Sequence, residues 1–459
     1  MRKRLLFGFL FAAVVSAQES KLGAEFRLER EKLAKECSDF KGLFGCGATL
    51  FTDHPLHVAA GSLAPQNGFG AGLAFLTGWN PNEDWRLNWN MDAVGTPNGS
   101  WRAGAYLNAA WIRRPRISVS GGSGAGSGST DIAVREMPVL QLYAEATSLK
   151  KVSYFGLGPD THNYDRTFFG FQETIVGTRG VFPLLSGLNL TLEAEANGRF
   201  VDIRPSTGQS SPSIEQVFTD ATAPGLNSQS AFLQFGEGLR IRPELARGHI
   251  RLNYSGRVQQ FISPGDSRHS FGRFIGDFSH EIPLYGTTRF TRTNPAMGPD
   301  DCAQSVQDQT CPRIPVSHNL EGSIGIRTLL TESFTSGANT VPFYFQPTLG
   351  GSDLNGSPTL ASFADYRFRA PNIFLVRASV EHSIWGPLGA MAMADWGKAS
   401  FDHFDVSHLR HSYSAGLTLR AGAFPLVYLL FSWGGGEGMH TIGRMNTSLL
   451  GSGSRPSLY

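Results

Sequence analysis

Between about residue 57 and residue 450, the chain repeats short segments in which every second residue is apolar and the intervening residues are polar, charged or Gly. This period of two is that of a β-strand with two different faces. The clearest segments are residues 85–93, 188–196, 250–258 and 413–421. About sixteen segments of roughly ten residues follow one another, separated by clusters of turn-forming residues. The pattern predicts an all-β protein.

Two classes of β protein contain such strands. A soluble sandwich or barrel buries its apolar face, whereas an outer-membrane barrel turns that face toward lipid and keeps a polar lumen. An even number of strands long enough to cross a bilayer favours the membrane barrel, because only closure pairs the edge groups that lipid cannot hydrogen-bond. Charged residues make up 17% of the chain, against about 25% in soluble proteins. We predict a transmembrane antiparallel β-barrel of about sixteen strands.

The positions of charged and aromatic residues along the predicted strands agree with a membrane barrel. The charged residues predicted to line the lumen are Arg257, Arg273, Asp277, Glu281, Glu321, Arg327, Arg377 and Glu381. Six tryptophans lie at or near predicted strand ends, where an aromatic girdle would place them; they are Trp79, Trp85, Trp101, Trp111, Trp385 and Trp433. An ordinary core position is an equally good interpretation of any single tryptophan.

The N-terminus has the features of an export signal. Three basic residues precede the apolar run Leu5–Val15, and Val15-Ser16-Ala17 has the small-residue pattern of a cleavage site. We therefore predict a secretory signal peptide over residues 1–17. The alternative, a membrane anchor helix, needs about 20 apolar residues, more than this run provides.

The rest of the chain divides into three predicted regions. Residues 18–56 are predicted to be a short periplasmic segment with an amphipathic helix over 24–41. Residues 57–450 form the barrel, and residues 451–459 are a C-terminal tail. The longest connection between strands runs from residue 332 to residue 372.

Four cysteines fall as two close pairs, Cys37 with Cys46 and Cys302 with Cys311. In an exported chain they suggest disulfides, for which three connectivities are allowed. We favour pairing within each close pair, because closing a short loop contributes roughly 2 to 3 kcal/mol. A metal site is a weaker alternative, since no His lies at ligand spacing beside either pair. We predict neither a metal nor a cofactor.

The sequence lacks the features that nucleic-acid binding, nucleotide binding and catalysis require. A net charge of +2 provides no field for nucleic acid. The Gly/Ser tract 118–130 is followed by neither Lys-Ser nor Lys-Thr, so we interpret it as a linker rather than a phosphate loop. His280 and His382 fall on the predicted lipid-facing side, and no Gly-x-Ser-x-Gly elbow occurs. We therefore predict no enzymatic activity and no catalytic residue.

The longest connection carries recognisable motifs. In order they are Val341-Pro342-Phe343-Tyr344, Leu349-Gly350-Gly351, Thr359-Leu360-Ala361-Ser362-Phe363 and Tyr366-Arg367-Phe368-Arg369. Together they resemble the sixth extracellular loop of the BamA/TamA superfamily, also called the bacterial surface antigen family. Downstream, Glu381 matches a luminal Glu of that family, and Met393–Gly397 resembles its Phe-x-Asp-x-Gly strand motif. Tyr154–Gly158 is similar to a loop of short members.

The resemblance covers most of residues 57–450 and implies a loop folded into the lumen against a strand motif. The residues it assigns to this site are Phe363, Arg367, Arg369, Glu381, Asp395 and Gly397. The family's loop tip is Arg-Gly-Phe, whose Arg reaches the Asp of the strand motif; here the tip is Ala361-Ser362-Phe363. Because an unpaired buried carboxylate is costly, we predict that another cation, with Arg367 and Arg369 as the first candidates, takes the place of the missing Arg beside Asp395, or that luminal water solvates Asp395.

The resemblance also bears on function. Family members that insert or secrete proteins carry periplasmic POTRA domains, and residues 18–56 are too few for one, so the chain is expected to be a short member without them. Assembly or translocation is implied by resemblance alone; a passive or gated channel and a structural barrel are the alternatives. The expected location is the outer membrane of a Gram-negative-type envelope, with residues 285–316 on the periplasmic side. The expected partners are outer-membrane lipid and other outer-membrane or periplasmic proteins.

Overall fold

A computed structural model of the chain describes residues 55–112, 137–185, 188–206, 209–246, 249–288, 317–421, 424–445 and 456–458. Residues 59–459 form one compact unit. The predicted signal peptide, amphipathic helix, cysteine pairs and Gly/Ser tract lie outside the described residues, as does most of 285–316. Among the residues that are described, no helix is long and apolar enough to cross a membrane.

The described residues form nineteen strands. Their bounds are β1 (Leu56–Ser62), β2 (Phe69–Trp79), β3 (Trp85–Gly95), β4 (Trp101–Trp111), β5 (Val139–Tyr154), β6 (Thr167–Leu185), β7 (Leu190–Pro205), β8 (Ala231–Ile241), β9 (Glu244–Leu245), β10 (Ile250–Ile262), β11 (Phe271–Thr288), β12 (Ser317–Phe334), β13 (Thr348–Leu349), β14 (Phe368–Arg369), β15 (Asn372–Trp385), β16 (Leu388–Ser400), β17 (Arg410–Ala421), β18 (Phe424–Trp433) and β19 (His440–Met445). Three of the four segments with the clearest alternation fall in β3, β10 and β17, as predicted, and the fourth falls in β7 from residue 190 onward.

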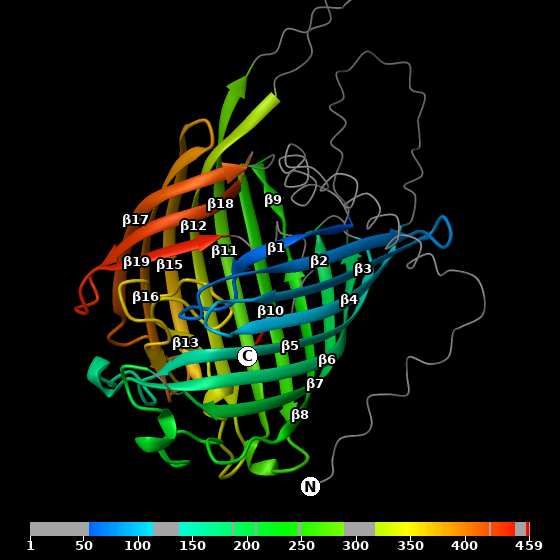
Figure 1. Ribbon diagram of the computed structural model, residues 1–459. Helices are drawn as coiled ribbons and strands as arrows, with labels where there is room; N and C mark the ends of the chain where they lie inside the picture. Colours follow the sequence, from blue (N-terminus) through cyan, green and yellow to red (C-terminus); the bar gives the residue numbers. More distant parts are fainter. Residues whose placement is uncertain are drawn as a thin grey trace, which may run out of the picture. The chain divides into compact units, whose positions relative to one another are not determined.

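Neighbours in the large sheet follow the order of the chain and are antiparallel. β1 pairs with β2, and each strand from β2 to β7 pairs with the next. β8 and β9 both pair with β10, so β9 continues β8 after a short break. The order then runs β10, β11, β12, β15, β16, β17, β18, β19. With β8 and β9 taken as one, the described sheet is a barrel of sixteen strands, as predicted (Figure 1).

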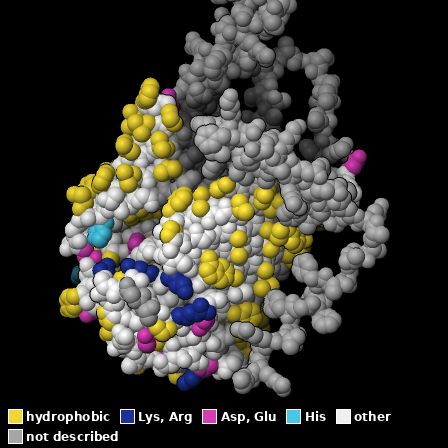
Figure 2. Space-filling model, in the orientation of Figure 1, with side chains coloured by type: hydrophobic (Ala, Val, Ile, Leu, Met, Phe, Trp, Pro, Cys, Tyr) yellow, Lys and Arg dark blue, Asp and Glu magenta, His cyan; other side chains and the backbone are white. Residues whose placement is uncertain are grey.

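The two faces of the strands differ as the alternation predicts. In β8, Leu233, Phe235 and Leu239 are exposed, whereas Gln234 between them is fully buried. Figure 2 shows hydrophobic side chains spread over the outer surface of the strands, while the Lys and Arg side chains in this view gather near the lower loops. An apolar outer belt around a polar interior is the arrangement of outer-membrane barrels.

The six tryptophans mark strand ends. Each is the first or last residue of its strand, and each is between 39% and 80% exposed. Trp79, Trp85, Trp111 and Trp385 lie at the end of the barrel with the connections 80–84 and 386–387, which we call the hairpin end. Trp101 and Trp433 lie at the opposite end, the loop end. The prediction that they occupy strand ends is confirmed.

Most of the predicted luminal charges make contacts inside the barrel. Those with such contacts are Arg257, Arg273, Asp277, Arg327, Arg377 and Glu381. Glu321 differs, because its carboxylate lies 3.9 Å from the ring of exposed His382. Glu321 falls where the register between β11 and β12 shifts, and such a shift changes the face toward which a side chain points. The prediction that Glu321 lines the lumen is therefore wrong.

Candidate functional site

The connection between β12 and β14 folds back against the inward-facing side chains of the barrel. It begins after Phe334, makes a 3₁₀ turn at Phe343–Phe345, forms β13, and returns through β14 to β15. Its aromatic residues are almost fully buried, and Phe345 lies 5.0 Å from Phe232 of β8 between ring centroids. We call residues 335–371 the inserted loop. Its position agrees with the resemblance to a loop folded into the lumen.

The tip of the inserted loop binds an ion pair on two neighbouring strands. Arg377 of β15 and Asp395 of β16 are direct cross-strand partners, and the guanidinium donates two hydrogen bonds, of 2.7 and 2.8 Å, to the carboxylate. The same guanidinium donates to the carbonyl of Pro358 at 2.6 Å. Asp395 accepts a 3.1 Å hydrogen bond from the backbone N–H of Leu360. The pair thus holds the loop by one carbonyl and one amide.

The prediction that another cation takes the place of the missing loop Arg is confirmed, but that cation is neither Arg367 nor Arg369. The alternative of solvation by luminal water is wrong. Asp395 is 1% exposed, and its cation is Arg377, which comes from the adjacent strand. A directly opposite cross-strand pair needs no loop side chain to reach across the lumen. The missing loop Arg is therefore replaced by a strand Arg, and the loop contributes backbone groups instead.

Arg367 anchors the loop to its neighbours at the loop end. Its Nε lies 2.5 Å from a carboxylate oxygen of Glu437, in the connection between β18 and β19. Its two terminal nitrogens donate to the side chain and the carbonyl of Thr161, both at 2.6 Å. The guanidinium also stacks over Phe155 and Phe368. These contacts join three separate connections of the barrel.

Arg369 stabilises the inserted loop from within. Its Nη1 donates to the carbonyls of Phe343 at 2.7 Å and Gln346 at 3.3 Å, which caps the 3₁₀ turn. Its own carbonyl accepts from the N–H of Gly158 at 2.7 Å. Gly158 belongs to the motif that resembles a loop of short family members, so the two motifs contact each other.

The remaining predicted residues support the same packing. Phe363 packs edge-to-face against Phe368 at 5.0 Å between centroids. Glu381 is buried and accepts a 3.2 Å hydrogen bond from Thr418. A Cβ on Gly397 would lie 2.9 Å from the carbonyl oxygen of Phe374 and 3.2 Å from a methyl of Leu349 in β13. Glycine at this position therefore allows the loop to approach β16.

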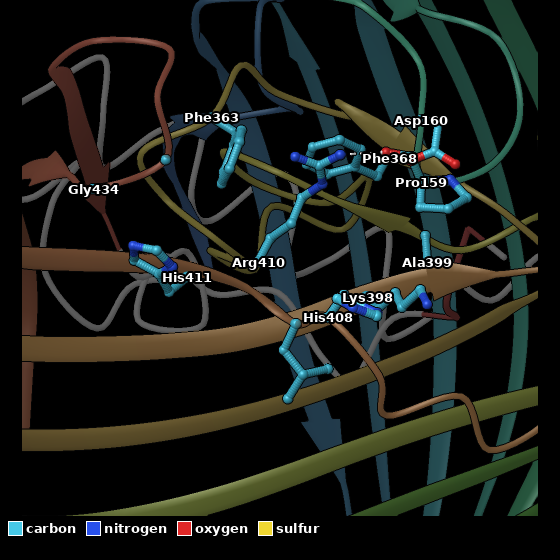
Figure 3. Close-up of a pocket in the computed structure, with 12 residues that line it drawn as sticks. Pro159, Asp160, Phe363, Phe368, Lys398, Ala399, His408, Arg410, His411 and Gly434 are labelled. Carbon is cyan, nitrogen blue, oxygen red and sulfur yellow. Dashed lines mark hydrogen bonds between the residues drawn. The ribbon is translucent and has the colours of Figure 1, made fainter.

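A cavity of about 620 Å³ opens beside the loop at the loop end. Figure 3 shows Arg410 lying against the ring of Phe368, with Pro159 and Asp160 on the far side. Arg410 donates to the carbonyl of Pro159 at 2.7 Å. Lys398, on the cavity wall, binds Asp405 at 2.5 Å, and its hydrogen bond lowers the pKa of that carboxyl. The cavity is thus lined by charged side chains and by the aromatic rings of Phe363 and Phe368.

Asp365, in the inserted loop, has a carboxyl group with a raised pKa. Burial raises the pKa of Asp365 to about 6, against the opposing effect of a 3.0 Å hydrogen bond from the N–H of Ser352. A buried carboxyl is easier to keep neutral than charged, because it has lost its hydration. The loop therefore gains charge as the pH rises toward neutrality.

Three residues of this site were not predicted from the sequence as loop contacts: Arg377, Thr161 and Glu437. Arg377 was assigned to the lumen, but its pairing with Asp395 depends on the register between β15 and β16. Glu437 and Thr161 lie on other connections, far away in sequence, and no local pattern indicates that they meet Arg367. Within the described residues, no group of His, Cys, Asp and Glu is arranged to hold a metal ion.

Comparison with known proteins yields only structural similarity. No protein-family model matches the chain, and neither does any curated protein. Among solved structures, the chain is similar to CdiB from Acinetobacter baumannii (9% identity, TM-score 0.40, 82% of this chain and 55% of that chain). It is also similar to BamA from Haemophilus ducreyi lacking POTRA domains 1–3 (13%, 0.42, 85% and 68%) and to CdiB from Escherichia coli (11%, 0.47, 83% and 59%). The chain spans 55% to 68% of the length of these three proteins.

Proposed function

We propose that the protein is an outer-membrane barrel that takes part in inserting or translocating other polypeptides, and that the inserted loop controls its lumen. The observation that supports this best is the binding of the loop tip by Arg377 and Asp395. The strand motif that resembles the family's motif is the part of the barrel that holds the loop motif. A barrel serving only as a membrane anchor has no need of a loop fixed in its lumen.

The contacts at the tip of the inserted loop are few enough for the tip to close the lumen and also to detach from the barrel wall. The tip is held by a few hydrogen bonds to the ion pair and by one from the N–H of Ser362 to Ser412. Hydrogen bonds of this kind contribute about 0.5 to 1.5 kcal/mol each, so they can be exchanged for contacts with a client. The ion pair itself stays intact when the loop leaves, because both partners are on strands.

The test is deletion of the gene in the native host, followed by quantitative mass spectrometry of the outer-membrane fraction. We expect other outer-membrane proteins to fall in abundance and to recover when the wild-type gene is restored. Restoring the variant Arg377→Met with Asp395→Leu, which keeps the packing but removes the loop anchor, should give incomplete recovery. Unchanged abundance of all other outer-membrane proteins in the deletion strain would refute the assembly role.

A gated channel is the second candidate, and the charges near the hairpin end favour it. Glu193 of β7 is shared by Arg179, Arg240 and Arg257 at 2.5 to 2.8 Å, which leaves a surplus of positive charge on that wall. Their side chains are 21% to 29% exposed, so this part of the lumen is open to solvent. Purified protein in planar bilayers should then show anion-selective openings, whereas a barrel that never conducts would exclude the channel.

A further inference from the structure

The last described residues of the chain lie inside the barrel. Leu458 is 8% exposed and belongs to the same buried cluster as Tyr344 and Phe345 of the inserted loop. Pro456 and Ser457 beside it are half-buried. In the sequence this segment has no hydrophobic pattern that would predict burial. The contacts that surround it belong to the barrel wall on one side and to the inserted loop on the other.

The wall contact is a fully buried arginine. Arg199 of β7 donates from Nη2 to the carbonyl of Ser457 at 2.7 Å, from Nη1 to Glu173 at 2.9 Å, and from Nε to Gln234 at 2.6 Å. The Arg199 side chain is 1% exposed. A guanidinium has five N–H donors in a fixed plane, so it can hold a wall carboxylate and still present one edge to a peptide carbonyl. The carboxylate of Glu173 fixes that orientation.

The loop contact is Asn355, at the tight turn of the inserted loop. Its Oδ1 accepts the backbone N–H of Leu458 at 2.9 Å, and its Nδ2 donates to the hydroxyl of Ser457 at 3.2 Å. The turn is closed by a 2.8 Å hydrogen bond from the N–H of Gly356 to the carbonyl of Asp353. One asparagine therefore binds a backbone N–H and a side chain of consecutive residues.

We propose that Arg199 and Asn355 form a peptide-binding site in the lumen, which residues 456–458 of the same chain occupy. A carbonyl recognised by Arg199, the following N–H recognised by Asn355 and an apolar side chain inserted into the aromatic cluster define the ligand. It is a short extended peptide with a Ser-Leu sequence. Because two of its contacts go to backbone atoms, the site accepts other extended peptides with a small polar residue before an apolar one. This site goes beyond the proposed function, since it needs no assembly or transport activity.

The occupying segment also links the wall to the loop. Arg199 holds Ser457 from β7, and Asn355 holds the same residue from the loop tip. The segment therefore opposes movement of the inserted loop out of the lumen. Loss of the segment should leave the loop attached through Arg377 and Asp395 but easier to displace.

The first experiment locates the segment in the intact protein. Leu458 is replaced by the photo-crosslinking residue benzoylphenylalanine in the full chain, which is irradiated in detergent micelles and digested for mass spectrometry. We expect crosslinks to peptides of the inserted loop or of the inner wall. Crosslinks confined to residues outside the barrel interior, or none at all, would overturn the proposal. This test does not depend on the folding of a shortened chain.

The second experiment measures binding in trans. A chain ending at Leu450 is titrated with a fluorescein-labelled peptide carrying the sequence of residues 455–459, and binding is followed by fluorescence anisotropy. We expect saturable binding to the shortened barrel and at least roughly tenfold weaker binding to the full chain, because the attached segment competes at high effective concentration. A peptide with Asp in place of Leu458 should not bind. Equal affinity for the shortened and full chains would overturn the proposal.

The matched variants are Asn355→Ala and Asn339→Ala in the shortened barrel. Both remove an asparagine from the inserted loop, but Asn339 donates to the carbonyl of Ser270 and does not touch the segment. We expect Asn355→Ala to weaken peptide binding about tenfold, since two hydrogen bonds are lost, and Asn339→Ala to leave it unchanged. Heat-modified migration on gels confirms that both barrels are folded. Equal effects of the two substitutions would show that Asn355 does not contact the peptide.

Discussion

The two halves of the lumen are built differently. In what we call the dry half, next to the cavity at the loop end, side chains are closely packed around the inserted loop. Tyr154, Phe169 and Phe345 are at most 1% exposed, and the Arg199–Glu173 pair is equally buried. In what we call the wet half, toward the hairpin end, side chains are less tightly packed, and Arg179 and Arg257 are 21% and 27% exposed around Glu193. The same strands line both halves. The difference comes from the inserted loop, which fills only one of them.

This contrast sets how much each charged pair contributes. In the dry half, removing one partner leaves an unpaired buried charge, which costs about 3 to 5 kcal/mol. In the wet half, water and salt screen the remaining charge, and exposed pairs contribute about 0 to 1 kcal/mol. Burial, and not the number of arginines, therefore decides which charges hold the barrel and its loop together.

Replacing the inserted loop should have the largest effect. If residues 341–369 are replaced by a short Gly/Ser linker, the aromatic side chains of the loop leave the lumen. Burial of each large apolar side chain contributes about 1.5 to 3 kcal/mol, so the barrel should lose several kcal/mol. The dry half should also become wet, and single-channel recordings should show steady conductance. A variant that stays closed would mean that another element blocks the lumen.

The next largest effect is expected for the ion pair under the loop tip. Arg377→Ala leaves Asp395 buried without its cation and should destabilise the barrel by about 3 to 5 kcal/mol, measured by thermal unfolding in detergent. The double substitution Arg377→Met with Asp395→Leu should recover most of this loss, because no charge is left unpaired.

The surface pair of Arg204 with Asp202 is the control for this experiment. Both side chains are about half exposed, at 48% and 54%, so Arg204→Ala should cost less than about 1 kcal/mol. A loss of similar size at both arginines would contradict the view that burial decides the contribution.

The sequence was sufficient to predict the barrel but not the difference between the two halves of its lumen. Alternation in segments such as 188–196 predicted strands and their faces, because a period of two is a local property. The position of the inserted loop followed from the resemblance of its motifs. The partner of Asp395 did not, since it depends on cross-strand register, and Glu321 was misplaced because one irregularity in pairing changes the face. The burial of Leu458 has no local sequence signal at all.

A smaller effect on stability is expected when a change in pH alters the charge of Asp365. The folded pKa of Asp365 is about 6, above its value near 3.9 in an unfolded chain. A raised carboxyl pKa means that the folded state binds the proton more tightly, so stability is highest below the unfolded pKa and falls as the pH rises from about 4 to 6. The fall from this group amounts to roughly 3 kcal/mol and is complete above pH 7.

Asp365→Asn mimics the protonated carboxyl and should remove this part of the pH dependence. The measurement is the difference in unfolding free energy between wild type and variant at pH 4 and at pH 7.5. We expect the variant to be the more stable form at pH 7.5 and similar to wild type at pH 4. A difference that does not change with pH would mean that water reaches Asp365 and that the dry half is smaller than its contacts indicate.

The smallest effect is expected in the wet half. Arg257→Ala removes one of three arginines that share Glu193, and the other two remain at 2.5 and 2.8 Å. The carboxylate stays paired, and the lost interaction was already screened, so the loss should be about 0 to 1 kcal/mol. Added salt should shrink it further, because the Debye length falls to about 3 Å at 1 M and solvent-exposed charges are screened more than buried ones. A loss as large as that of Arg377→Ala, unchanged by salt, would show that the hairpin half excludes water as well, and the distinction between the two halves would fail.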